Sequence, residues 1–573
     1  MIRIRSFLIG IACIALTIST AAVSVPIRAQ KGMVASQSEI ASKIGADAIR
    51  DGGTAVDGAV ATAFALAVVH PTAGNIGGGG FMVYRPAKGD PVAYDFREVA
   101  PAKASPTMFI KDGKYNPELH HNSYLAVGVP GTVAGLHMAW REQGKLPWKR
   151  LVEPAIALAR DGFTVSDGLA RSLKSVMRQM QKYPASVAQF SKNGTPYEAG
   201  DTLKQPDLAR TLERIANQGP AGFYEGETAL ALEKEMLAHE GLITRQDLKN
   251  YTAKKRVPVK GTYRGYEVIS MPPISSGGVG IIEMLNVLEG YELSSMGPGS
   301  AAAVHLMVEA MKRSYADRAR YLGDPDFVKD MPLSRLMSKD YAADLRKTID
   351  PKRTKPSSPT SFEWSHESDE TTHISIVDAD RNAVSMTYTL EQGYGVKIVV
   401  PGAGFLLNNQ MGDFNAGPGL TNTEGLIGTD PNLAAPGKRM LSSMTPTVIA
   451  RDGKLFMVSG SPGGRTIINT VLETIVDVID FGMNAQEAVD APRFHHQWLP
   501  DKIQYEKYGL SADTLAELQR RGHALQEIRE QGTAQVIVYN AKDDMLEGGT
   551  DRRAADGAAV GVIGRKSEVR SQK

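Results

Sequence analysis

A threonine stands where the character of the chain changes sharply. Residues 353–370, RTKPSSPTSFEWSHESDE, are rich in Pro, Ser and charged residues without hydrophobic periodicity, which is typical of an exposed connection. Thr371 follows and opens TTHISIVDAD, where apolar and polar residues alternate as in a strand. Cleavage between Glu370 and Thr371 would free an amine that can act as general base for the Thr371 hydroxyl. On spacing alone, however, Thr371 is better interpreted as an ordinary strand residue that follows a loop.

Glycine-rich segments offer two further kinds of chemistry. GNIGGGGFM, starting at Gly74, is not followed by the Lys-Ser or Lys-Thr pair of a nucleotide site, so close backbone packing is the better interpretation. SGSPGG resembles a serine-hydrolase elbow around Ser461, but Ser459 stands where the first glycine belongs. Gly463 and Gly464 precede a predicted helix, so their N–H groups can stabilise an oxyanion.

Histidine pairs raise the question of a metal site. His120-His121 and His495-His496 are adjacent residues, and neighbours on a strand point to opposite faces. Neither pair comes with a matching carboxylate motif. We therefore expect no metal and no cofactor.

The elements around these residues can be read from periodicity. Ser36 and Glu39 have capping-box spacing before an amphipathic helix that stops near Gly52. Residues 55–69 are almost wholly apolar but too short to span a membrane, which predicts a buried helix. Residues 148–248 carry helical periodicity throughout.

Two hairpins are predicted in the last third of the chain. TTHISIVDAD and NAVSMTYTL alternate on either side of a polar turn, and PTVIARDGKLFMVSG turns at Asp452-Gly453. A helix over residues 465–480 follows, stopped by Gly482. Hairpins flanked by helices imply layered sheets covered by helices.

Bulk properties limit the partners. The 573 residues include 65 basic and 63 acidic ones, which gives no electrostatic reason to expect a nucleic-acid partner or an anionic membrane surface. A small zwitterionic or neutral substrate suits this balance better. The length allows more than one structural unit.

The N-terminus has the pattern of a secretory signal. Arg3 and Arg5 precede an apolar run over residues 7–23, and small residues follow at 20–24 and again at Ala29. We predict a signal peptide over residues 1–29 and export to the periplasm or the medium, with a retained membrane anchor as the alternative. Cys13, the sole cysteine, lies in this run, so the mature chain has no disulfide, cysteine-ligated zinc or thiol nucleophile.

Motifs along nearly the whole mature chain resemble the gamma-glutamyltransferase family. They include TTHISIVD, LLNNQMGDF, KRMLSSMTPT, SGSPGG and APRFHHQW, and in the first half NIGGGGFM, YDFREVAP, VPGTVAG, SMPPISSGGVG and ARYLGDPDF. The resemblance implies an α/β fold, the N-terminal-nucleophile αββα sandwich. It also implies two subunits generated by self-cleavage, a large one over residues 30–370 and a small catalytic one over residues 371–573.

The same resemblance assigns site residues. It implies Thr371 as the nucleophile, Thr389 as the hydroxyl that orients it, and Gly463 and Gly464 as the oxyanion turn. The donor's amino-acid head needs a cationic pocket for its carboxylate and an anionic one for its ammonium. The matching residues are, for the carboxylate, Arg97, Ser442 and Ser443, and for the ammonium, Glu391, Gln410 and Asp413. Glu391 stands where some relatives have Asn.

The implied reaction is two-step acyl transfer without a cofactor. The gamma-amide of glutathione or a related compound acylates Thr371, and water, an amino acid or a peptide then removes the acyl group. Residues 415–438 resemble the family's lid, with Glu424 where many relatives place an aromatic residue. The alternatives are a cephalosporin or glutaryl acylase of the same fold, although that branch tends to lose the acid at Asp413, and a processed but inactive binding protein.

Overall fold

Two antiparallel sheets form the centre of the molecule. The computed structural model describes residues 24–357, 371–420 and 429–563. In spatial order the first seven-stranded sheet contains β1 (Ile27–Ala29), β22 (Met545–Thr550), β21 (Gln535–Asn540), β17 (Lys454–Gly460), β16 (Thr447–Arg451), β13 (Tyr266–Ser270) and β12 (Val259–Tyr263). The second contains β11 (Lys254–Arg256), β4 (Val92–Phe96), β3 (Gly79–Arg85), β15 (Ala383–Thr389), β14 (Thr372–Val377), β2 (Met33–Ser36) and β23 (Ala558–Gly561).

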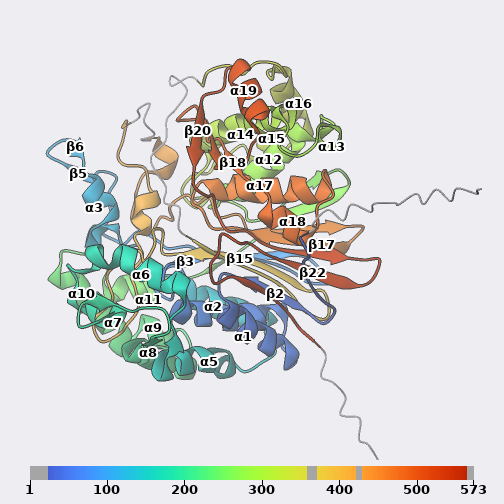
Figure 1. Ribbon diagram of the computed structural model, residues 1–573. Coiled ribbons are helices and arrows are strands. Elements are labelled where there is room, and N and C mark those ends of the chain that lie inside the picture. Colours follow the sequence, from blue (N-terminus) through green and yellow to red (C-terminus); the bar gives the residue numbers. More distant parts are fainter. Residues whose placement is uncertain (1–23, 358–370, 421–428, 564–573) are drawn as a thin grey trace, which may run out of the picture.

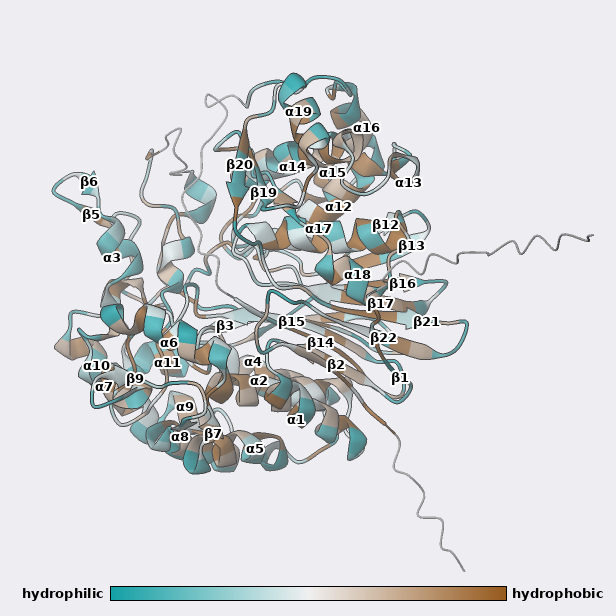
Figure 2. Cartoon of the chain, in the orientation of Figure 1, coloured by the Kyte–Doolittle hydropathy of each residue, from teal (hydrophilic) through white to brown (hydrophobic). Residues whose placement is uncertain are grey.

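The sheets stack face to face, with helices on both outer faces (Figure 1). The first sheet is covered by α12 (Gly277–Leu288), α17 (Thr466–Ile479) and α18 (Ala485–Asp490). The second is covered by α1 (Glu39–Arg50), α2 (Ala55–Val69) and α4 (Thr132–Gln143). Figure 2 shows hydrophobic residues on the stacked strands and both hydrophobic and hydrophilic residues on the helices outside them. The layer order is therefore helix, sheet, sheet, helix, as the sequence predicts.

Further helices extend each covering layer. Beyond the second sheet lie α5 (Trp148–Asp161), α6 (Asp167–Met180), α7 (Pro184–Phe190), α8 (Pro206–Gln218), α9 (Ala221–Tyr224), α10 (Gly226–Ala238) and α11 (Arg245–Asn250). Beyond the first lie α13 (Leu293–Met296), α14 (Ala301–Tyr321), α15 (Leu333–Leu336), α16 (Lys339–Lys347) and α19 (Ala512–Arg520). The helical expectation for residues 148–248 is confirmed.

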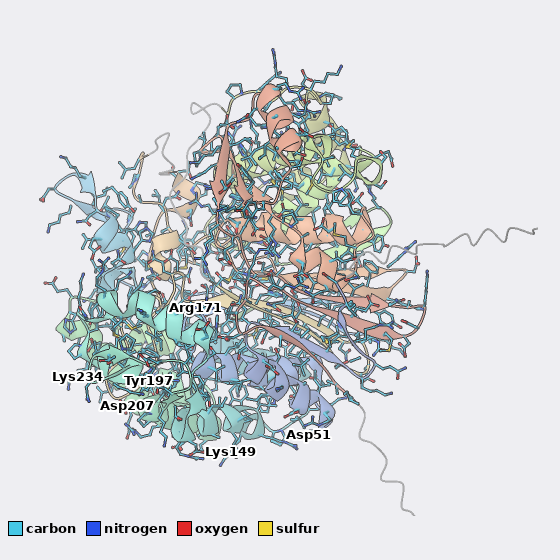
Figure 3. The ribbon with its side chains drawn as sticks, viewed as in Figure 1. Asp51, Lys149, Arg171, Tyr197, Asp207 and Lys234 are labelled. Carbon is cyan, nitrogen blue, oxygen red and sulfur yellow. The ribbon has the colours of Figure 1, made fainter. Side chains whose placement is uncertain are left out.

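The outer surface of the helices that cover the second sheet carries charges of both signs. Figure 3 labels Asp51, Lys149, Arg171, Asp207 and Lys234 along this face. Asp51 pairs with Arg150 at 2.6 Å. The interspersed signs create no extended field of one charge on these helices.

The hairpin that begins at Thr371 lies inside the second sheet. β14 and β15 pair antiparallel from Thr372 with Tyr388 to Val377 with Ala383, and β3 continues the ladder beyond β15. Both strands are buried along their whole length. Thr371 precedes the first residue of β14, so a strand in the middle of a rigid sheet fixes its position.

Two further expectations about the elements hold, and one is wrong. α2 is buried at every residue, and the β16–β17 hairpin turns at Asp452 and Gly453. The capping-box assignment to Ser36 is wrong, because Ser38 caps α1 by accepting a hydrogen bond from the Ala41 N–H. The Ser36 hydroxyl instead lies 2.8 Å from that of Ser42. Ser36 and Ser38 both precede α1, so spacing alone could not decide which of them is the cap.

The first described residues join the sheet. β1 pairs with β22, placing Ile27 opposite Gly548 and Ala29 opposite Leu546. Most of the predicted signal segment, residues 1–23, lies outside the described residues, and no described helix has the length and apolar character of a bilayer span.

A buried histidine ties the two sheets together below the site. His373 lies on β14, with Nδ1 2.7 Å from the Thr387 hydroxyl and Nε2 3.1 Å from that of Ser375. Its ring packs against Gly460 of the facing sheet, where an added Cβ would lie 2.0 Å from the ring. Burial lowers the pKa of His373 to about 3.

Acid should therefore destabilise the fold partly through His373. An unfolded histidine takes up a proton near pH 6.5, whereas the folded one does so only near pH 3, so stability falls as the pH drops through this window. Between about pH 6.5 and 5 one such group costs about 2 kcal/mol. His373→Gln should lose correspondingly less stability than the unmutated protein between pH 7 and 5 in thermal melts. If the variant and the unmutated protein lose the same stability between pH 7 and 5, His373 does not contribute to the destabilisation by acid.

Candidate active site

Two threonine hydroxyls meet at the start of the central hairpin. The Thr371 Oγ1 donates to Thr389 Oγ1 at 3.4 Å, and Thr389 Oγ1 also accepts the Glu391 N–H at 2.9 Å. Thr371 is 5% exposed and Thr389 2%. The second hydroxyl can therefore hold the first in one orientation.

The glycine pair forms a turn ahead of α17. Gly463 has φ 129° and Gly464 φ 53°, values that a residue with a Cβ rarely adopts. The Gly463 carbonyl accepts the Thr466 N–H that begins the helix. Within the described residues the two glycine N–H groups donate no hydrogen bond, and they lie at the positive end of α17. They are available for a developing oxyanion.

A buried guanidinium lies at the far side of the site. Arg97 follows β4 and has 1% of its side chain exposed. Its Nη2 donates to Asp413 and, at 3.3 Å, to the Leu441 carbonyl, while Nε donates to the Met440 carbonyl at 3.3 Å. Its Nη1 makes no hydrogen bond with a described residue. A buried donor of this kind suits a substrate carboxylate.

Acidic and amide groups lie beside Arg97. Gln410 Nε2 donates to the Asp413 carboxylate at 2.6 Å, and both residues belong to the 3-10 turn Gln410–Asp413. Glu391 is 4% exposed and has φ 82°, and its carboxylate lies 3.8 Å from His121 Nδ1. Burial raises the pKa of Glu98 to about 8, although Arg97 opposes the rise. At neutral pH Glu98 is thus largely protonated, and Arg97 makes its direct carboxylate contact with Asp413.

Ser442 and Ser443 form hydrogen bonds with two residues that the sequence alone did not identify as part of the site. Ser276 Oγ donates to the Ser442 carbonyl at 2.7 Å. Arg318, on α14, donates to Ser276 Oγ at 2.7 Å and to Ser443 Oγ at 3.0 Å. Ser276 lies within the motif SMPPISSGGVG and Arg318 directly precedes ARYLGDPDF, but motif agreement alone assigns no contact.

One pocket, called the head pocket below, brings the predicted residues together. Its lining consists of Arg97, Thr371, Thr389, Glu391, Gln410, Asp413, Ser442, Ser443, Gly464, Met444 and Ile467. Gly463 adjoins it in the same turn without lining it. Glu370 and Glu424 lie outside the described residues. The pocket thus has a hydroxyl pair at one position and opposite charges at another, which suits a substrate with a zwitterionic end.

Comparison with known proteins identifies the family. The sequence model of the gamma-glutamyltranspeptidase family matches residues 41–561. The chain is 49% identical over 541 residues to the glutathione hydrolase proenzyme of Escherichia coli (strain K12), covering 94% of this chain and 93% of that one. The chain belongs to the gamma-glutamyltranspeptidase family.

Solved structures place this family member in the same fold class. A cephalosporin acylase from Bacillus halodurans superposes with a TM-score of 0.83 at 27% identity, covering 94% of this chain and 97% of that one. A gamma-glutamyltranspeptidase chain from Helicobacter pylori is 46% identical, with a TM-score of 0.55, covering 56% of this chain and 91% of that one. The mixed α/β fold is therefore shared by transpeptidase and acylase structures.

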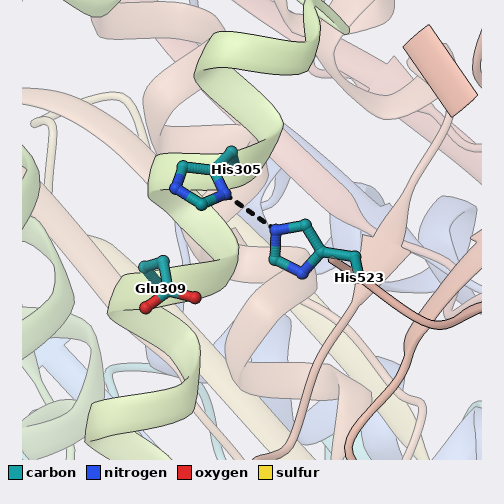
Figure 4. A group of neighbouring side chains, drawn as sticks. All are labelled: His305, Glu309 and His523. Atoms are coloured by element: carbon teal, nitrogen blue, oxygen red, sulfur yellow. Dashed lines mark hydrogen bonds between the residues drawn. The ribbon is translucent and has the colours of Figure 1, made fainter. Parts of the chain in front are cut away.

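A histidine cluster away from the head pocket has residue types that ligate metals. His305 and Glu309 lie on α14 and face His523 (Figure 4). His305 Nε2 donates to the Asp350 carbonyl, so Nδ1 accepts from His523 Nε2 at 2.7 Å. Glu309 accepts hydrogen bonds from Thr354 at 2.6 Å and Arg313 at 2.7 Å. These hydrogen bonds give the cluster a structural role, because the bond between His305 and His523 links α14 to the C-terminal region.

Proposed function

We propose that this gamma-glutamyltranspeptidase family member is a self-cleaving enzyme that transfers gamma-glutamyl groups through an ester on Thr371. The observation that carries the proposal is that one pocket is lined by the threonine pair, by Gly464 of the oxyanion turn and by the opposed charges Arg97 and Asp413. Donors are glutathione and other gamma-glutamyl compounds. Acceptors are water, amino acids or peptides.

The first step uses groups at one end of the head pocket. The Thr371 hydroxyl attacks the gamma-amide carbon while the free Thr371 amine takes its proton and passes it to the leaving nitrogen. Thr389 orients the attacking oxygen. The negative charge on the amide oxygen is stabilised by the Gly463 and Gly464 N–H groups.

The opposite end recognises the donor's head group. Arg97 and the hydroxyls of Ser442 and Ser443 bind the α-carboxylate, and Asp413, Gln410 and Glu391 bind the α-ammonium. The Arg97–Asp413 ion pair already places the two charges side by side. A glutaryl acylase has no ammonium to bind, so the partly buried Asp413 favours gamma-glutamyl donors over that alternative.

The active form is proposed to consist of two chains. Residues 30–370 form the large subunit and residues 371–573 the small one, and each sheet contains strands from both ranges. The Helicobacter pylori chain supports this division, because it is matched over 91% of its length yet spans 56% of this chain. Export to the periplasm or the medium follows from the signal pattern and is part of the proposal.

Hydrolysis of a chromogenic gamma-glutamyl amide by purified protein tests the proposal directly. The corresponding glutaryl amide serves as the matched comparison, since it lacks only the ammonium. Faster turnover of the glutaryl compound would favour the acylase alternative.

Arg97→Lys should weaken donor use while leaving self-cleavage intact. Lysine keeps the charge but loses the two-point contact with a carboxylate and the bonds to the Met440 and Leu441 carbonyls. A loss of roughly tenfold or more in kcat/KM is expected from charge-assisted hydrogen bonds. Steady-state kinetics on fully cleaved enzyme measure it. Retention of the unmutated kcat/KM would remove Arg97 as the carboxylate anchor.

A further inference from the structure

A cavity of about 610 Å³ lies among the helices outside the first sheet. We call it the acidic cavity and define it by Met307, Glu473, Asp477, Phe481, Asp490 and Phe494. Its walls come mainly from α14, α17, α18 and β18 (Phe494–His495), and none of its lining residues also lines the head pocket. Only Ser24 of the described lining residues belongs to the predicted signal segment, so its removal leaves the other walls in place. The volume is that of a small-molecule site.

Two buried carboxylates one turn apart on α17 line the acidic cavity. Glu473 is 5% exposed, and although its Oε1 accepts the Phe494 N–H at 2.9 Å, its Oε2 makes no hydrogen bond with a described residue. Asp477 is 9% exposed, and no hydrogen bond or ion pair joins its carboxylate to a described residue. Buried acids are costly to the fold unless a positive group compensates them.

The walls of the acidic cavity supply no positive group. No Lys, Arg or His is among the described lining residues, whereas Glu487 and Asp490 of α18 add two further acids. The Asp490 carboxylate lies 3.3 Å from the guanidinium of Arg552, but that side chain is 74% exposed and does not line the cavity. A ligand that enters therefore meets acids without a countercharge beside them.

Burial affects the two acids of α17 as expected for uncompensated carboxylates. It raises the pKa of Asp477 to about 7 and that of Glu473 well above its usual range. The Arg493 guanidinium opposes both rises, but it donates to Asp551 and to the Gln531 carbonyl, each at 2.7 Å. A cation in the cavity would stabilise the ionised form of both acids.

Apolar side chains form much of the remaining wall. They include Val304, Met307, Phe481, Phe494 and Leu510. Such walls do not suit a bare metal ion, because Ca²⁺ takes about six to eight oxygen ligands and carbon atoms cannot complete that shell. They suit the hydrocarbon part of an organic ligand.

We propose that the acidic cavity binds an organic ammonium ion with an apolar chain. The ammonium lies against Asp477 and Glu473, where it donates charge-assisted hydrogen bonds. The chain lies against Met307, Phe481 and Phe494. This site is separate from the head pocket, whose ammonium-binding acid belongs to the gamma-glutamyl donor.

Calorimetric titration of the purified enzyme with hexylammonium chloride tests the chemistry of the ligand. Hexan-1-ol keeps the chain without the charge, and ethylammonium keeps the charge on a shorter chain. Each should bind at least about tenfold more weakly than hexylammonium. Calcium chloride should not displace hexylammonium. Equal affinity for hexan-1-ol or ethylammonium, displacement by calcium, or no binding of hexylammonium would overturn the proposal.

Two variants test the place of binding. Asp477→Asn keeps the shape of the side chain and should weaken hexylammonium binding about tenfold or more. Glu473→Gln, which keeps an oxygen for the Phe494 N–H, should also weaken it. Asp344→Asn, at a position on α16 whose side chain is 67% exposed, is the matched control and should leave the affinity unchanged.

Melting temperatures without ligand separate loss of the site from loss of the fold. Both cavity variants should melt at or above the temperature of the unmutated protein, because a buried amide needs no countercharge. A lower melting temperature in both would show that the empty cavity already compensates its acids and would contradict the proposal. Unchanged hexylammonium affinity in both variants would equally remove the acidic cavity as the site.

Discussion

Thr371→Ala is expected to yield a single uncleaved chain without detectable turnover. The substitution removes the hydroxyl that must attack both the preceding peptide bond and the donor amide. A loss on the order of 10⁴-fold or more in kcat is expected when a nucleophile is deleted. Gel electrophoresis of purified protein and an assay on a gamma-glutamyl amide measure both effects.

Two variants control this result. Thr372→Ala changes the next residue, which is fully buried and whose Oγ1 makes no hydrogen bond with a described residue, so cleavage and activity should persist. Thr371→Ser keeps a hydroxyl and should retain some self-cleavage. Turnover by Thr371→Ala at the unmutated rate would show that another residue is the nucleophile.

Asp413→Asn should change donor choice more than any other head-pocket substitution. The change keeps the shape of the side chain but removes the negative charge that we assign to the donor's ammonium. A charge-assisted hydrogen bond contributes roughly 1.5 to 3 kcal/mol, so gamma-glutamyl kcat/KM should fall about tenfold to a few hundredfold. Kinetics on fully cleaved enzyme provide the measurement.

The contacts of Asp413 refine the control for this variant. Its carboxylate also accepts hydrogen bonds from Arg97 and Gln410, so the substitution loosens the carboxylate anchor as well. A glutaryl amide, which lacks the ammonium, should therefore lose less than the gamma-glutamyl amide but not be wholly spared. Equal losses for the two amides would mean that Asp413 supports Arg97 and does not bind the ammonium.

Periodicity predicted the elements around the site, because period and turn chemistry are local properties. The β14–β15 hairpin, the buried helix α2 and the turn before α17 are all confirmed. The cap of α1 was misplaced by two residues, since Ser36 and Ser38 both have hydroxyls near the helix start.

Contacts between distant segments were beyond reach of the sequence alone. Arg97 and Asp413 are 316 residues apart, and motif resemblance assigned them to the carboxylate and the ammonium of one donor head group without indicating that they pair with each other. Arg318 and Ser276 support the serine pair through the packing of α14 against the first residues of α12. Such pairings depend on how the layers stack, which no local pattern encodes.

The most direct test of the account is the intact mass of the purified, unmutated protein together with the N-terminal sequence of each chain. We predict two chains, of which the smaller begins at Thr371 with the sequence TTHIS and has the mass of residues 371–573. A fully active protein that remains one chain, or a smaller chain that begins at any other residue, would contradict the role of Thr371 as nucleophile.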